Sequence, residues 1–257
     1  MEYQYIENGN KKLYSVYYEP QGRDSKEVGI IMCYPIGQEY IRCHKLYVTL
    51  AKKIAEHGFH VLRFDYSGTG DSYGEFSSFS IEQAIEDIDL AVKELKEACG
   101  LKKIMLVGVR LGATLSLLYS QKAKIDGLIL WNPIFDGIQY LKELDYTYEK
   151  WLSGSFTKEK RDQEVGLASF GFTYSSNLIN QIQSICINKN YFPIEVPILL
   201  IDDDIDNDFN NSTYLFFEKS INKEYWLKRV DELNKSMVPI YELNKTIDWL
   251  INTNQNG

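Results

Sequence analysis

Between residues 28 and 133, short apolar runs alternate with segments that carry one apolar stripe at helical spacing. The runs at 28–34, 59–66, 103–108 and 127–133 are short and rich in apolar residues, as expected of strands buried on both faces of a sheet. The segments between them repeat apolar residues every three or four positions, which is typical of helices packed on a sheet. This order predicts an α/β fold with a mostly parallel central sheet and helices on both faces.

Local signals mark the ends of several predicted elements. Ser80 precedes a helical stripe and Gln83 follows it by three residues, which is the pattern of a capping box, and Gly100 ends the same helix. Gly58 stops the helix predicted over 39–58, and Pro239 lies near the first turn of the closing helix. Two further strands and the closing helix are predicted at 11–18, 196–202 and 238–251.

The alternating pattern breaks after Pro133. Residues 137–192 are rich in Tyr, Lys, Glu and Asn and contain no apolar run long enough for a central strand. We therefore predict a small helical lid, or cap, inserted at 137–192, with residues 1–136 and 193–257 forming the core. The aromatic residues expected in this lid, as lid core or as ligand contacts, are Tyr140, Tyr146, Tyr148 and Trp151.

Composition excludes several classes of partner. The net charge of −8 opposes binding to nucleic acid or to an anionic membrane surface, because both require a basic footprint. The opening residues have neither the charged nor the apolar region of a secretory signal, so we expect none, and no apolar run is long enough to span a membrane. The four cysteines are scattered and predict reduced core thiols, without a metal site or cofactor. We expect a cytoplasmic protein.

The stretch "IMLVGVRLGA" at 104–113 holds the outline Gly-x-Arg-x-Gly between a predicted strand and a predicted helix. Many enzymes hold a nucleophilic serine at the middle of such a turn. Here the middle residue is Arg110, whose guanidinium stays protonated at any working pH and cannot act as a nucleophile.

Together with this turn, the stretches "YPIGQEYIRCHK" and "GFHVLRFDYSGTGDS" resemble the α/β-hydrolase superfamily. They are most similar to its serine-aminopeptidase-like branch, which includes the exosortase-associated hydrolases. The resemblance covers roughly residues 28–135. It implies an α/β-hydrolase fold, a lid, a nucleophile elbow at Arg110 and, in an active member, hydrolysis of esters or related acyl compounds.

The triad that this resemblance implies is incomplete. Its members follow the chain order nucleophile, acid, histidine, but His44, His57 and His60 are the only histidines and all precede Arg110. The stretch 228–239, where the family's histidine would stand, contains none. The acid has candidates after the strand at 196–202, namely Asp202, Asp203 and Asp204, although three successive acids are also typical of a solvated loop.

The backbone of an oxyanion hole survives side-chain substitution. The resemblance implies one donor at the N–H of Leu111, at the start of a helix whose dipole favours anions. The second would come from the loop around Ile36, Gly37 and Gln38.

Two interpretations of Arg110 are open. In the first, the guanidinium is buried in a structural ion pair with Glu39 or with one of the acids at 202–204. In the second, Arg110 holds a carboxylate, phosphate or thioester-bearing ligand through its planar fork of donors. His44 is a further candidate for ligand hydrogen bonding or proton transfer, against the simpler interpretation of a surface or packing histidine.

The sequence therefore predicts a non-catalytic α/β-hydrolase-fold protein whose altered pocket binds a small acidic or acyl-type ligand, or which serves as an accessory protein. An active hydrolase or acyltransferase that uses His44 and acts on an ester or thioester is the alternative. A protein-interaction scaffold, as a homo-oligomer or with another protein, is the third hypothesis.

Overall fold

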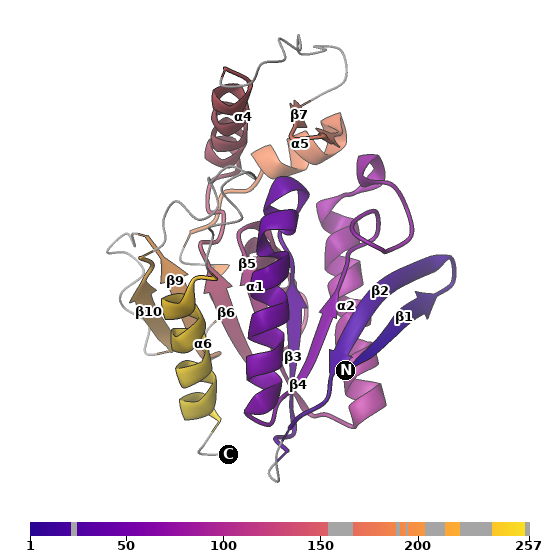
Figure 1. Ribbon diagram of the computed structural model, residues 1–257, viewed down its shortest axis with the longest axis vertical. Helices are drawn as coiled ribbons and strands as arrows, with labels where there is room; N and C mark the ends of the chain where they lie inside the picture. Colours follow the sequence, from indigo (N-terminus) through magenta and orange to yellow (C-terminus); the bar gives the residue numbers. More distant parts are fainter. Residues whose placement is uncertain are drawn as a thin grey trace.

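The central sheet follows the predicted alternation of strands and helices (Figure 1). The computed structural model describes residues 1–21, 25–153, 167–188, 191–193, 195–203, 214–221 and 238–254. Within them, eight strands form one sheet in the order β1-β2-β4-β3-β5-β6-β9-β10. Their bounds are β1 (Glu2–Asn8), β2 (Lys11–Tyr18), β3 (Val28–Cys33), β4 (His60–Phe64), β5 (Lys103–Val109), β6 (Gly127–Trp131), β9 (Ile198–Asp202) and β10 (Leu215–Lys219).

Strand direction explains where a site can form. β1 and β2 form an antiparallel hairpin, and β2 joins β4 antiparallel. From β4 through β10 all neighbours are parallel, so the carboxyl ends of these strands meet at one edge. Ligands of open α/β sheets bind outside this edge. The central strand β3 is buried along its whole length, as its apolar sequence predicts.

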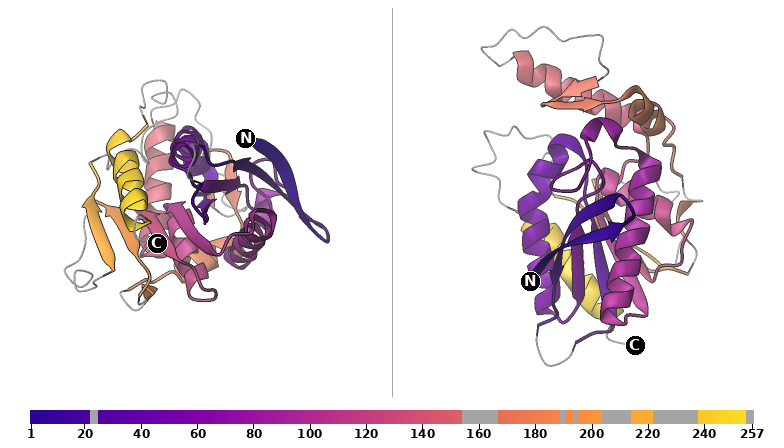
Figure 2. Two further views of the ribbon diagram at one scale, coloured as in Figure 1. Left: turned by 90° about the horizontal axis from the view of Figure 1, so that it is seen from below. Right: turned by 90° about the vertical axis from the view of Figure 1, so that its right-hand side faces the viewer.

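Helices cover both faces of the sheet. α1 (Gly37–Glu56) and α6 (Ile240–Thr253) lie on one face, and α2 (Ile81–Cys99) and α3 (Leu111–Ser120) pack together on the other (Figure 2). The N-cap and C-cap predicted for α2 are confirmed, because Ser80 accepts a hydrogen bond from the Gln83 N–H and Gly100 adopts a left-handed φ of 66°. The capping box is not completed, because the Gln83 side chain donates to Glu86 and Asp87 instead of accepting from the Ser80 N–H.

The described residues of the segment 137–192, here called the cap, lie beyond the carboxyl edge of the sheet (Figures 1 and 2). It contains α4 (Gly137–Ser153), α5 (Ser176–Gln183) and a hairpin of β7 (Leu167–Ser169) and β8 (Phe172–Tyr174). The insertion was expected to be mainly helical, and the hairpin of two short strands was not foreseen. Its strands have only three residues each, which is too short to produce a detectable alternating pattern. Gln181 of α5 accepts a hydrogen bond from the Ile81 N–H and so ties the cap to the start of α2.

The strands β1 and β10, at the two edges of the sheet, were not predicted from the sequence. Edge strands are partly exposed and lack a continuous apolar run, so they leave a weaker signal. The cysteines are free, as expected, but only Cys33 and Cys43 are buried, whereas Cys99 is half-buried and Cys186 is exposed.

Candidate functional site

The turn between β5 and α3 has the geometry of a nucleophile elbow. Arg110 adopts φ 52° and ψ −123°, a conformation that L-residues rarely adopt and that costs about 1–3 kcal/mol. Both flanking glycines are required by close packing. A Cβ on Gly112 would overlap the carbonyl oxygen of Cys33, and one on Gly108 would overlap the backbone of α3. The turn therefore keeps the strained geometry that presents a side chain, although that side chain is a guanidinium.

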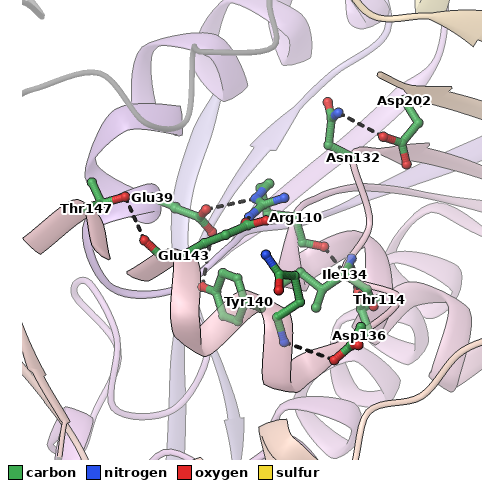
Figure 3. Close-up of polar contacts among 11 residues, drawn as sticks. Glu39, Arg110, Thr114, Asn132, Ile134, Asp136, Tyr140, Glu143, Thr147 and Asp202 are labelled. Carbon is green, nitrogen blue, oxygen red and sulfur yellow. Dashed lines mark hydrogen bonds and ion pairs between the residues drawn. The ribbon is translucent and has the colours of Figure 1, made fainter. Parts of the chain in front are cut away.

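Arg110 is held by two carboxylates (Figure 3). Its Nε donates to Glu39 Oε1 at 2.8 Å, and one terminal nitrogen donates to Glu143 Oε2 at 3.1 Å. Glu39 lies in the first turn of α1 and its side chain is only 5% exposed, whereas Glu143 lies on α4 of the cap and is 39% exposed. One of the two carboxylates is therefore buried and belongs to the core, and the other is partly exposed and belongs to the cap.

Two buried tyrosines complete the network. The Tyr140 hydroxyl donates to Glu39 Oε2 at 3.2 Å, and the Arg110 guanidinium lies 5.4 Å from the centre of the Tyr140 ring, in a cation–π contact. Burial raises the pKa of Tyr140 and of Tyr174, so both phenols are neutral at pH 7. Burial alone would lower the pKa of Arg110, but Glu39 and Tyr140 outweigh that effect and raise it.

The space around the guanidinium is small. A cavity of about 20 Å³ lies between α1, the elbow and the cap, which is room for about one water molecule. In the described part of the chain its lining residues are Gln38, Glu39, Arg42, Arg110, Tyr140, Glu143, Leu144, Thr147 and Phe170. The pocket expected at the elbow is therefore largely filled by the protein's own side chains.

The expected oxyanion loop leads directly into α1. Ile36 is the residue before the helix, and Gly37 begins it with a φ of 59°. A Cβ on Gly37 would overlap the hydroxyl of Tyr174, so the cap hairpin closes tightly over this loop. Leu111 is buried and begins α3. The first-turn N–H groups of a helix have no intrahelical partner, and two helices begin beside Arg110.

The histidines lie elsewhere. His44 is exposed on α1 and is not among the described residues that line the cavity. This exposure favours the simpler interpretation of a surface histidine over that of a pocket residue. His57 follows α1 and hydrogen-bonds the carbonyl of Lys53, and His60 hydrogen-bonds the Tyr17 hydroxyl.

The predicted acids take different places. Asp202 ends β9 and accepts a hydrogen bond from the Asn132 side chain at 3.2 Å, in a pair that lies apart from Glu39 and Arg110 (Figure 3). Burial raises the pKa of Asp202 to about 6, against the opposing charge of Arg110. The Asp203 N–H donates to the same carboxylate. Asp204 and residues 228–237 lie outside the described residues.

Of the acids considered in the sequence, the structure pairs Arg110 with Glu39. Sequence reasoning missed Tyr140 as a partner of Glu39, and it missed Glu143 entirely, because the packing of the cap decides which of its polar residues reaches the elbow. Arg42, also unforeseen, is buried three residues after Glu39 on α1. Residues three positions apart lie on the same face of a helix, so the spacing from Glu39 could have indicated that Arg42 faces the same site.

The model of a family described as serine aminopeptidase, S33, matches residues 40–176, more than half of the chain. This chain belongs to the serine aminopeptidase S33 family. Membership confirms the resemblance inferred from the sequence, and with it the α/β-hydrolase fold. A search of curated proteins gives no match.

Solved structures share the fold over nearly the full length. A monoglyceride lipase variant from Saccharomyces cerevisiae, in complex with a substrate analog, has a TM-score of 0.69 at 16% identity, covering 99% of this chain and 96% of the lipase. Est1E from Butyrivibrio proteoclasticus, with bound ferulic acid, has a TM-score of 0.62 at 17% identity, covering 95% and 98%. A serine hydrolase homologue from Coxiella burnetii has a TM-score of 0.56 at 17% identity, covering 98% and 96%. At these identities the likeness shows the fold alone.

Searches for two other features give negative results within the described ranges. No helix there has the length and apolar character needed to cross a bilayer. The same residues contain no group of three or more His, Cys, Asp or Glu side chains placed to hold a metal ion.

Proposed function

We propose that this chain is a non-catalytic member of the S33 family, a binding or accessory protein of the cytoplasm whose elbow holds a fixed positive charge. The observation that carries the proposal is the 2.8 Å ion pair between Arg110 and Glu39 at the position where a nucleophile would stand. A buried charge is retained only when it is paired, and this pair closes the elbow against the first turn of α1.

The chemistry of the residues present supports this role. A hydrolase of this fold needs a nucleophile at the elbow and a histidine to take its proton, and no histidine follows Arg110 in the sequence. Glu39 is the nearest group with nucleophilic oxygens. Both of these oxygens accept hydrogen bonds, from Arg110 and from Tyr140, which lowers their reactivity.

The cap also fills the site. Tyr140 and Tyr174 are buried, and Tyr148 and Trp151 stack on each other and contact Phe170. Among the four aromatic residues expected in the lid, only Tyr146 is strongly exposed, at 69%. These aromatic side chains therefore support a packed cap better than an aromatic interaction surface.

The test is turnover by the full-length protein. We expect no hydrolysis of p-nitrophenyl acetate, p-nitrophenyl butyrate or an acyl thioester above the buffer rate. Turnover that is lost in Arg110→Met would overturn the proposal. Turnover that survives in Arg110→Met and is lost in His44→Ala would favour the alternative, a hydrolase with displaced chemistry.

A further inference from the structure

The guanidinium of Arg110 has more donors than the described residues of the protein accept from. Of its five N–H groups, the one at Nε donates to Glu39, and one on a terminal nitrogen donates to Glu143. The side chain is 13% exposed, so its outer edge reaches the mouth of the cavity. A planar fork with free donors is suited to a second planar acceptor, above all a carboxylate.

The two glutamates hold Arg110 differently. Glu39 is almost fully buried and is fixed by Tyr140 as well as by Arg110. Glu143 is 39% exposed and belongs to the cap, and within the described ranges its carboxylate accepts a hydrogen bond only from Arg110, at 3.1 Å. Partly exposed ion pairs are weak because water competes for both partners. Glu143 is therefore the exchangeable ligand of the guanidinium, and Glu39 is the permanent one.

Gln38 provides an independent sign of a ligand. Its side chain is buried and lines the same cavity, and its amide nitrogen has no hydrogen-bond partner among the residues that the structure describes. A buried donor without an acceptor is costly. An acceptor that enters the cavity beside Arg110 would satisfy it.

We propose that the outer edge of Arg110 is a binding site for a short-chain monocarboxylate, which Glu143 occupies as an internal competitor. The inference rests on the proposed non-catalytic role, since it treats the elbow as a place that holds an anion. When the ligand arrives, its carboxylate takes the place of the Glu143 carboxylate on Arg110. One carboxylate replaces another at the guanidinium.

Charge and shape select the ligand class. A monocarboxylate replaces the single charge of Glu143, whereas a phosphate dianion would add negative charge beside Glu39. Beyond the guanidinium the cavity is walled by Leu144, Thr147 and Phe170, which offer an apolar contact for a short aliphatic tail. The cavity of about 20 Å³ by itself holds about one water molecule, so the tail lies in the space that the displaced Glu143 side chain leaves, and only a chain of similar length fits there.

Exchange would also act on the cap. Glu143 is the ion-pair partner that α4 supplies to Arg110 at the elbow. Its release removes one link between the cap and the core, while Tyr140 keeps its bond to Glu39.

Calorimetric titration of the full-length protein with butyrate tests the inference. We expect binding to the wild type, and binding about twofold to sixfold tighter in Glu143→Gln, because the variant no longer competes for the site. Glu97→Gln removes the same charge at an exposed position on α2 and should leave the butyrate Kd unchanged. Arg110→Lys keeps the charge but loses the fork, and should bind at least tenfold more weakly.

Butyramide, which has the same shape without the charge, should not bind, and inorganic phosphate should bind more weakly than butyrate. Equal butyrate affinity in the wild type and Glu143→Gln, no binding to either, or preference for phosphate would each overturn the inference. Its failure is separable from that of the proposed function. Absent butyrate binding without ester turnover removes only the ligand assignment, whereas Arg110-dependent turnover removes the non-catalytic role.

Discussion

Arg110 Nε and Glu39 Oε1 lie 2.8 Å apart, and this bond joins the elbow between β5 and α3 to the first turn of α1. The two residues are 71 positions apart in the sequence. Because Glu39 is only 5% exposed, its charge is compensated inside the protein rather than by solvent.

Breaking this pair from one side should be costly. Arg110→Met leaves the Glu39 carboxylate buried without its cation, and we expect a loss of about 3–5 kcal/mol in the free energy of unfolding. The double variant Arg110→Met with Glu39→Met removes both charges and should recover most of that loss, because apolar residues of similar volume replace a buried pair at little cost. Urea unfolding of the wild type, the two single variants and the double variant measures this cycle. A loss below about 1 kcal/mol in Arg110→Met would mean that the pair has no structural role.

The contact between the cap hairpin and the start of α1 can be tested with two glycines. Gly37 and Gly9 both have φ 59°, but a Cβ on Gly37 overlaps the Tyr174 hydroxyl, whereas a Cβ on Gly9 meets nothing. Gly9→Ala should cost only backbone strain, about 1 kcal/mol. Gly37→Ala should cost about 1–3 kcal/mol more, as for other overpacked sites.

Adding Tyr174→Phe removes the overlapping hydroxyl and should reduce the excess cost of Gly37→Ala. Thermal unfolding of the four proteins measures these differences. Equal costs at both glycines would contradict the close packing of the cap on this loop.

The sequence predicted the parts of the fold that burial controls. Strands β3, β5 and β6 are buried nearly throughout and were found because nothing in them faces water. The hairpin of β7 and β8 was missed because three-residue strands leave no periodic signal.

The site was predictable only in part. Glu39 was expected near Arg110 because the loop after β3 and the turn after β5 end at the same edge of parallel strands. For His44 the sequence left a pocket role and a surface role open, and the phase of the helix favours the surface role. His44 lies five residues after Glu39, about 140° around the helix, and therefore faces solvent while Arg42 and Cys43 are buried. Glu143 depends on how the cap docks, which no local pattern encodes.

Asp202 should make stability depend on pH. Burial raises its pKa to about 6 in the folded protein, above the value of about 3.9 for an unfolded chain. The folded state therefore binds the proton more tightly than the unfolded chain. The resulting contribution to the free energy of unfolding is fully present below about pH 4 and is lost as pH rises through 6. Between pH 4.5 and pH 7 the free energy of unfolding of the wild type should fall by about 2 kcal/mol more than that of Asp202→Asn.

Urea unfolding at the two pH values measures the difference. Asp248→Asn alters an exposed acid on α6 and should behave like the wild type. The same pH dependence in Asp202→Asn and in the wild type would contradict the raised pKa of Asp202.

The most direct measurement of the central claim is hydrolysis of p-nitrophenyl butyrate by the wild type and by Arg110→Ser, assayed side by side on folded protein. Arg110→Ser returns a hydroxyl to the elbow, but no histidine follows it in the chain and Glu39 loses its cation. We predict that both proteins stay at the buffer rate. Turnover by Arg110→Ser that exceeds the wild type would show that a working triad survives around the elbow, and would contradict the view that this site now holds a charge.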